Sequence, residues 1–159
     1  DGRPPALPAR AGNSNRPTDC GSHAPLDLVG SRLVDWGSTR VLLVGTGRYA
    51  ATTVASLRER GAVDITVYSP TGRAQLFANR MNLTPTNDVR RAIGSSDVVI
   101  TCTTRLSVEV EDVPSGARAI VVDLGLPRNV DPAVGKLDGI ALLDLRSETI
   151  FDRMVEDQN

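Results

Sequence analysis

Aromatic residues are scarce in this sequence, and so is charge of one sign. Phe, Trp and Tyr make up 3% of the 159 residues, so the chain lacks the stacking surfaces with which many proteins hold single-stranded nucleic acid. The formal net charge is −1, which argues against general electrostatic attraction to nucleic acid or anionic membranes. The two cysteines, Cys20 and Cys102, are too few for a disulfide framework and indicate a reducing, cytoplasmic setting.

Long apolar runs are also absent. No run approaches the roughly 20 residues of a membrane-spanning helix, and the N-terminal stretch lacks the apolar core of a signal peptide. The remaining composition, 40% hydrophobic and 23% charged, is typical of a globular protein. A chain of 159 residues is long enough for one domain with a sizeable core.

The first 25 residues differ in composition from the rest of the chain. They contain half of the 10 prolines and almost no large apolar residue, so they cannot bury enough surface to offset the entropy of ordering them. We predict a Pro/Gly-rich tail or linker over residues 1–25 and a folded domain over residues 26–147. Residues 148–159 are typical of the first turns of a connecting helix that is cut short.

Apolar runs alternate with helical patterns from residue 26 onwards. Most runs are continuous, as expected for strands buried on both faces of a parallel sheet. The predicted strands are Val41–Val44, Ile65–Tyr68, Val98–Cys102, Ile120–Leu124 and Ile140–Leu145, with a weaker one at Leu83–Thr84. The predicted helices are Tyr49–Arg60, Gly72–Met81, Val89–Ile93 and a short one carrying Leu26, Val29, Leu33 and Trp36. This alternation predicts an α/β chain with a three-layer Rossmann fold, whose doubly wound sheet is mostly parallel.

A glycine-rich turn links the first predicted strand to the helix that follows it. Residues 45–50, Gly-Thr-Gly-Arg-Tyr-Ala, fit the G-x-G-x-x-G/A pattern of dinucleotide-binding proteins. Gly45 permits the tight turn, Gly47 lets a pyrophosphate approach the backbone, and the amides at the helix start would hold the phosphates. The alternative is a tight strand-to-helix connection without a ligand. The residues predicted to bind the cofactor in this turn are Gly45, Thr46, Gly47, Arg48 and Tyr49.

The loop after the second predicted strand indicates which cofactor binds. Proteins specific for NAD usually carry an acidic residue there, about 20 residues after the glycine turn, to bind the ribose 2′-hydroxyl. Here Ser69, Thr71 and Arg73 supply hydroxyls and a cation instead, so NADP is favoured over NAD. In the alternative interpretation Ser69 and Thr71 cap the next helix and Arg73 is a solvated surface residue.

The fourth strand ends at the edge where ligands of such sheets bind. Thr101, Thr103 and Thr104 are placed to line the ribose on the nicotinamide side. Cys102 has apolar neighbours and no adjacent base, which favours an inert buried thiol over a nucleophile. His23, the single histidine, lies in the predicted tail. No catalytic residue and no metal site is therefore predicted.

Residues 120–145, "IVVDLGLPRNVDPAVGKLDGIALLDL", resemble the NADPH-binding domain of glutamyl-tRNA reductases. The shared features are the segments Asp123–Arg128 and Asp131–Gly135, the glycine turn "VLLVGTGRYA" and the strand "SDVVITCTT". The "DLGLPRNVDPAVG" stretch is the most distinctive of them, and the resemblance covers about residues 26–155. We add Gly125 of this stretch to the predicted cofactor contacts.

The chain departs from this family in three respects. Ser69-Pro70-Thr71 stands where members usually have Asn-Arg-Thr, so the guanidinium contact to the 2′-phosphate is either lost or supplied by Arg73. Asn129 replaces a more usual aspartate. The family's N-terminal domain, whose cysteine forms a thioester with the glutamyl group, and its C-terminal dimerisation domain have no counterpart in the sequence.

The resemblance implies a part in tetrapyrrole (porphyrin) synthesis. The parent enzyme would be an oxidoreductase that uses NADPH to reduce glutamyl-tRNA to glutamate-1-semialdehyde, a homodimer through its C-terminal domain. This chain would bind the nucleotide and present its hydride, contact glutamyl-tRNA only through the other domains, and be inactive alone because it lacks an activated thiol. Two alternatives are a stand-alone nucleotide-binding regulatory module and a small reductase similar to precorrin-2 dehydrogenase.

Overall fold

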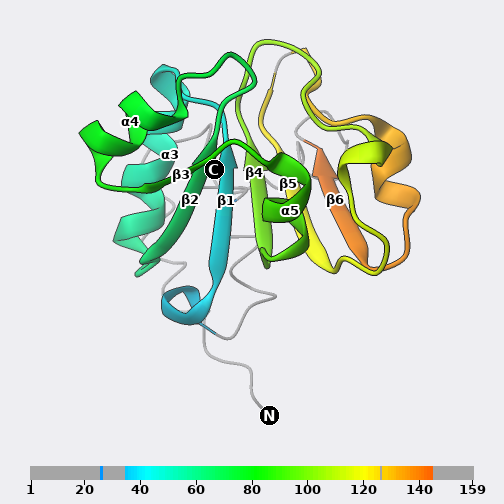
Figure 1. Ribbon diagram of the computed structural model, residues 1–159. Helices are drawn as coiled ribbons and strands as arrows, with labels where there is room; N and C mark the ends of the chain where they lie inside the picture. The colour runs from blue at the N-terminus through cyan, green and yellow to red at the C-terminus, as the bar shows by residue number, and fades with distance from the viewer. Residues whose placement is uncertain (1–25, 27–34, 126, 145–159) are drawn as a thin grey trace, which may run out of the picture.

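Six parallel strands form the central sheet of the computed structural model, which describes residues 26, 35–125 and 127–144 (Figure 1). The strands are β1 (Arg40–Val44), β2 (Asp64–Tyr68), β3 (Thr84–Thr86), β4 (Val98–Thr101), β5 (Ala119–Asp123) and β6 (Ile140–Asp144). Their order in the sheet is β3-β2-β1-β4-β5-β6, that of the doubly wound dinucleotide-binding fold. The predicted fold class is confirmed.

The helices lie on both faces of this sheet. They are α3 (Arg48–Glu59), α4 (Ala74–Met81), α5 (Val89–Gly94), and the 3₁₀ helices η2 (Trp36–Ser38), η3 (Val110–Asp112) and η4 (Pro132–Lys136). Residues of α3 and α4 pack into the hydrophobic cluster on one face, and residues of α5 and η4 into the cluster on the other. The chain therefore changes face when it passes from β3 through α5 to β4 (Figure 1).

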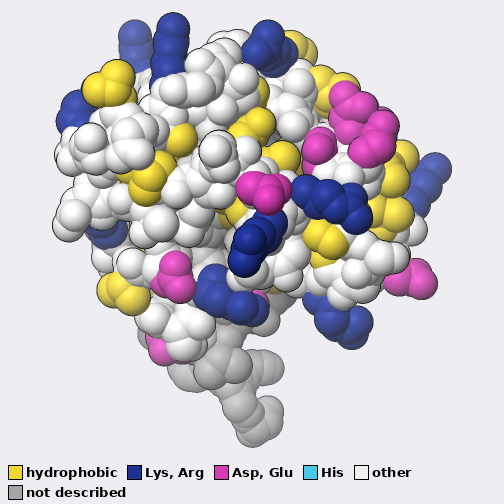
Figure 2. Space-filling model, viewed as in Figure 1, with side chains coloured by type: hydrophobic (Ala, Val, Ile, Leu, Met, Phe, Trp, Pro, Cys, Tyr) yellow, Lys and Arg dark blue, Asp and Glu magenta, His cyan; other side chains and the backbone are white. Residues whose placement is uncertain are grey.

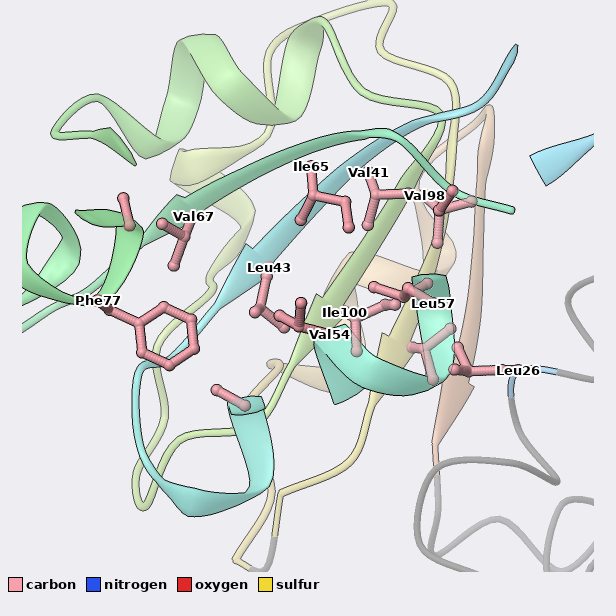
Figure 3. Packing of buried hydrophobic residues seen from close by; sticks show 14 of the residues in the cluster. Leu26, Val41, Leu43, Val54, Leu57, Ile65, Val67, Phe77, Val98 and Ile100 are labelled. Carbon is pink, nitrogen blue, oxygen red and sulfur yellow. The ribbon is translucent and has the colours of Figure 1, made fainter. Parts of the chain in front are cut away.

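Strand β1 shows how one strand serves both faces. Its alternate residues Val41 and Leu43 belong to the cluster that α3 and α4 cover, and Leu42 and Val44 belong to the opposite cluster. All four are at most 1% exposed. Figure 3 shows the first cluster, in which side chains of α3 and α4 lie against β1, β2 and β4. Because Val41–Val44 are all apolar and buried, this part of β1 reads as a continuous apolar run, as a central parallel strand requires.

Several predicted boundaries differ from the structure. The weak edge strand lies at Thr84–Thr86 instead of Leu83–Thr84, and it contains Pro85, which an edge position tolerates. The short helix predicted between Leu26 and Trp36 lies mostly outside the described residues, although both of these end residues are buried in the first cluster. The predicted tail and terminal helix also lie outside them. No helix in the described part of the chain has the length and apolarity that crossing a bilayer demands.

An ion pair ties β1 to the turn before β4 at the amino edge of the sheet. Asp97 accepts hydrogen bonds from the backbone N–H of Arg40 at 2.8 Å and from its Nη2 at 3.0 Å. The Asp97 backbone N–H donates to the Arg40 carbonyl at 2.8 Å. The hydrogen bond from the Arg40 guanidinium lowers the pKa of the Asp97 carboxyl below its ordinary value of 3.8.

Candidate functional site

The carboxyl ends of four neighbouring strands meet at one edge of the sheet. Val44, the last residue of β1, lies opposite Tyr68 of β2 and Thr101 of β4, and Thr101 lies opposite Asp123 of β5. The loops after these strands therefore lie side by side at the top of Figure 1. Connections from β1 and from β4 leave toward opposite faces, so this edge contains the topological switch point where ligands of open α/β sheets bind.

Gly45 makes the turn at the end of β1, and its conformation requires glycine. Its φ is +133°, and its backbone N–H donates to the carbonyl of Tyr68 at 2.9 Å. A Cβ at this position would lie 2.7 Å from the carbonyl oxygen of Cys102 on the adjacent strand end. Gly45 is thus required by the fold, whether or not a ligand binds.

Gly47, the N-cap of α3, has no such structural requirement. Its φ of −86° is open to any residue, and a Cβ there would meet nothing within 4 Å. The backbone N–H groups of Thr46, Gly47, Arg48 and Tyr49 have no hydrogen-bond partner among the described residues. These amides at a helix start, beside an exposed glycine, are a ready site for an anion. Behind them, buried Ala50 lets α3 pack closely on the sheet.

The loop after β2 is held by its own hydroxyl groups. Ser69 is 6% exposed, and its Oγ accepts a hydrogen bond from the Thr71 backbone N–H at 3.2 Å and lies 3.0 Å from Thr71 Oγ1. Helix α4 begins after Arg73 without a side-chain cap, so the alternative in which Ser69 and Thr71 cap it is wrong. Thr71 and Arg73 are exposed, and the Arg73 side chain has no partner among the described residues.

The predicted residues at the end of β4 and in the loop after it lie in a hydrogen-bonded setting. Thr101 is fully buried and its Oγ1 donates to Asp123 Oδ1 at 3.3 Å, whereas half-buried Thr103 donates through Oγ1 to the Arg105 carbonyl at 2.7 Å. Burial raises the pKa of the Cys102 thiol to about 12, so it stays protonated at neutral pH. Across the residues with described placement, no three His, Cys, Asp or Glu side chains gather as a metal site would require.

Two buried polar residues at this edge were missed by the sequence reasoning. Asp123, 1% exposed, accepts hydrogen bonds from the backbone N–H groups of Gly125 at 2.9 Å, Asn129 at 2.9 Å and Val130 at 3.0 Å. Asn129 is fully buried, and the predicted contact residue Gly125 lies directly against its side-chain amide. The sequence signal for this arrangement was the aspartate at the end of the otherwise apolar run "AIVVD". A buried carboxylate needs hydrogen-bond donors around it, here backbone N–H groups.

Positive charge follows each of the four strand ends. One exposed arginine stands in each loop, and none of the loops contains an acidic residue. The loops are residues 45–48, 69–73, 102–107 and 124–130, and the arginines are Arg48, Arg73, Arg105 and Arg128. Figure 2 shows Lys and Arg side chains along the same upper margin of the molecule. This distribution favours an anionic ligand with several phosphates, although the whole chain carries a net charge of −1.

Sequence comparisons place this chain in a known family. The family model described as shikimate / quinate 5-dehydrogenase matches residues 27–147. The glutamyl-tRNA reductase of Clavibacter michiganensis subsp. michiganensis is 48% identical over 133 residues, which cover 77% of this chain and 30% of that protein. The glutamyl-tRNA reductase of Tropheryma whipplei (strain Twist) is 32% identical over an alignment 166 residues long. This alignment covers 84% of this chain and 37% of that protein.

A comparison with solved structures finds the same fold. Glutamyl-tRNA reductase from Methanopyrus kandleri has a TM-score of 0.72 at 23% identity, with 87% of this chain and 37% of that chain covered. The nucleotide-binding domain of glutamyl-tRNA reductase from Thermoplasma volcanium has a TM-score of 0.53 at 22% identity, with 86% and 91% covered. The chain spans about a third of the length of the curated relatives. By the match over residues 27–147, the chain belongs to the shikimate / quinate 5-dehydrogenase family, and it aligns with one segment of glutamyl-tRNA reductases.

Proposed function

We propose that this chain is the NADPH-binding domain of a glutamyl-tRNA reductase. The observation that carries the proposal is the glycine turn at the switch point, in a chain that is 48% identical to a segment of such a reductase. The pyrophosphate would lie against the unpartnered amides at the start of α3, where Gly47 leaves the backbone uncovered. The regulatory module and the small precorrin-2 dehydrogenase-like reductase are not favoured by the comparisons.

The 2′-phosphate of NADPH would lie over the loop after β2. Ser69 and Thr71 offer hydroxyls there, and exposed Arg73 offers a guanidinium that pairs with no other described group. A charge-assisted hydrogen bond to phosphate is worth about 1.5–3 kcal/mol, or roughly tenfold to a hundredfold in affinity. Because Pro70 stands where the family usually has arginine, we expect the lower end of that range.

The chain's own residues would bind and orient the cofactor, and the chemistry would need a further group. NADPH, when bound, supplies a hydride. Capture of the glutamyl group requires an activated thiol, and Cys102, with a pKa of about 12, is not one. In this proposal the thiol, the contacts to glutamyl-tRNA and the dimer interface belong to other parts of a longer reductase, which acts in tetrapyrrole synthesis.

Titration of the chain with NADPH and with NADH tests the proposal. We expect NADPH to bind about tenfold more tightly, because only NADPH carries the 2′-phosphate. Equal affinities would refute the assignment of the loop after β2. When glutamyl-tRNA and NADPH are supplied together, we expect no semialdehyde, and turnover that disappears in Cys102→Ser would show that the active site has been misplaced.

A further inference from the structure

The buried side chain of Asn129 joins the two loops that follow β4 and β5. Its Nδ2 donates to the carbonyl of Arg105 at 2.9 Å, and it lies 3.2 Å from the carbonyls of Thr103 and Pro127. Its Oδ1 accepts a hydrogen bond from the Thr103 backbone N–H at 2.7 Å. One amide group thus contacts two positions in the β4 loop, Thr103 and Arg105, and the middle of the β5 loop. Both its donor and its acceptor are in use.

The backbone of Asn129 is fixed as firmly as its side chain. Its N–H donates to Asp123 Oδ2 at 2.9 Å, and its carbonyl accepts from the N–H groups of Ser107 at 2.7 Å and Val108 at 3.0 Å. A Cβ on Gly125 would overlap the Asn129 side-chain amide, so the absence of a side chain there gives the amide its space. Asn129 is 0% exposed, and no buried side-chain polar atom in the described part of the chain lacks a partner.

The two joined loops lie on one side of the switch point, and the glycine turn lies on the other. In a doubly wound dinucleotide-binding sheet, each half of the strand order binds one mononucleotide. The loops after β1 and β2 carry the features proposed to hold the adenosine half. The loops after β4 and β5 therefore face the nicotinamide half, whose ring must be held in one orientation for hydride transfer.

We propose that Asn129 is a positioning residue for the nicotinamide half of the cofactor, an inference that rests on the proposed function. Its amide fixes the separation and orientation of the two loops without itself contacting the ligand. Leucine in its place, of similar volume, would lose both the donors and the acceptor. The Thr103 N–H and the carbonyls of Arg105 and Pro127 would then lack these partners, and the loops would separate.

Asn129→Leu tests this inference when binding of two ligands is compared. NADPH spans both halves of the site, whereas adenosine 2′,5′-bisphosphate carries both phosphates of the adenosine half and no nicotinamide. We expect the variant to bind NADPH about tenfold more weakly and adenosine 2′,5′-bisphosphate within about twofold of the wild type. Asn79→Leu is the matched control, because Asn79 is exposed on α4 and its Oδ1 only accepts from Gln75. It should leave both affinities unchanged.

A milder variant covers the case in which Asn129→Leu does not fold. Ser107 Oγ donates to the Arg105 carbonyl at 3.0 Å and lies 2.8 Å from Thr103 Oγ1, so Ser107→Ala loosens the same loop without introducing charge. We expect a loss of about threefold for NADPH alone. Equal losses for both ligands, or unchanged NADPH affinity in a folded variant of either kind, overturn the inference. If the wild type binds neither ligand, the proposed function itself fails.

Discussion

Replacing each of the two glycines of the turn after β1 by alanine should have a different effect. Gly45→Ala should destabilise the fold, whereas Gly47→Ala should weaken NADPH binding. Gly45 has a φ of +133°, and its new Cβ would lie 2.7 Å from the carbonyl oxygen and 3.2 Å from Sγ of Cys102. That backbone cannot easily retreat, because the Cys102 N–H donates to the Val44 carbonyl at 2.9 Å. Gly47 has a φ of −86° and open space around its Cβ position.

The expected free energies of unfolding follow from this geometry. In Gly45→Ala, backbone strain at positive φ costs about 1–3 kcal/mol and the overlap costs about 1–3 kcal/mol more. The total of roughly 2–6 kcal/mol is a large part of the about 5–15 kcal/mol that stabilises a typical domain. Gly47→Ala loses only the preference for glycine over alanine at an N-cap, about 0.5 kcal/mol.

Urea unfolding and NADPH titration of both variants measure the two effects separately. Trp36 is 9% exposed in the core, so its fluorescence reports unfolding. Gly47→Ala should keep a near-normal unfolding midpoint and lose at least about tenfold in NADPH affinity, because its methyl group occupies the approach of the pyrophosphate. Gly61→Ala is the control for Gly45→Ala, since Gly61 has a φ of +98° without any atom within 4 Å of a Cβ. Comparing the two variants therefore separates the cost of backbone strain from the cost of steric overlap.

Two results would refute this reasoning. A folded Gly47→Ala that binds NADPH as tightly as the wild type would show that the phosphates do not lie on this turn. If Gly45→Ala were no less stable than Gly61→Ala, the close approach between the ends of β1 and β4 would be wrong.

Three further predictions concern cofactor choice, the free thiol and pH. Ser69→Asp should reverse the preference from NADPH to NADH in paired titrations, because a carboxylate repels the 2′-phosphate and accepts from the ribose hydroxyls; a variant that still prefers NADPH would contradict the assignment. Cys102 should react with iodoacetamide at pH 8 far more slowly in the folded chain than in urea, since its pKa is about 12; equal rates would contradict this raised pKa. Asp97→Asn should cost about 0.5–1 kcal/mol at pH 7, because the pair with Arg40 is partly exposed. The pKa of Asp97 is lowered in the folded chain, so this difference in urea midpoint should be complete above the ordinary value of 3.8 and disappear as the pH falls below it.

The central strands could be predicted from sequence because both of their faces are buried. The runs at Val41–Val44 and Ile65–Tyr68 begin one residue late but otherwise match β1 and β2. The edge strand β3 gave a weak signal, because three residues including Pro85 provide too short a pattern. The 3₁₀ helices η3 and η4 were not predicted, since single turns have no apolar period.

The candidate site likewise contains local features that could be predicted from sequence and long-range features that could not. The glycine turn could be predicted because its residues are contiguous and its requirement, a tight turn before a helix, is local. The Asn129 network could not, because the hydrogen bond from the Thr103 N–H to Asn129 spans 26 residues in sequence. Only the register between β4 and β5 brings those residues together. A single asparagine in a loop carries no sign of that arrangement in the sequence.

The two halves of the carboxyl edge differ in how their polar groups are satisfied. On the β1 and β2 side, the amides of α3's first turn and the Arg73 guanidinium face solvent with no partner among the described residues, so a ligand replaces water there. On the β4 and β5 side, Asp123 and Asn129 use buried hydrogen bonds to hold the backbone in place. An anion gains affinity from groups left unpaired, whereas a reacting ring gains orientation from loops already ordered. This division matches what a hydride donor needs, which is affinity at the adenosine half and geometry at the nicotinamide half.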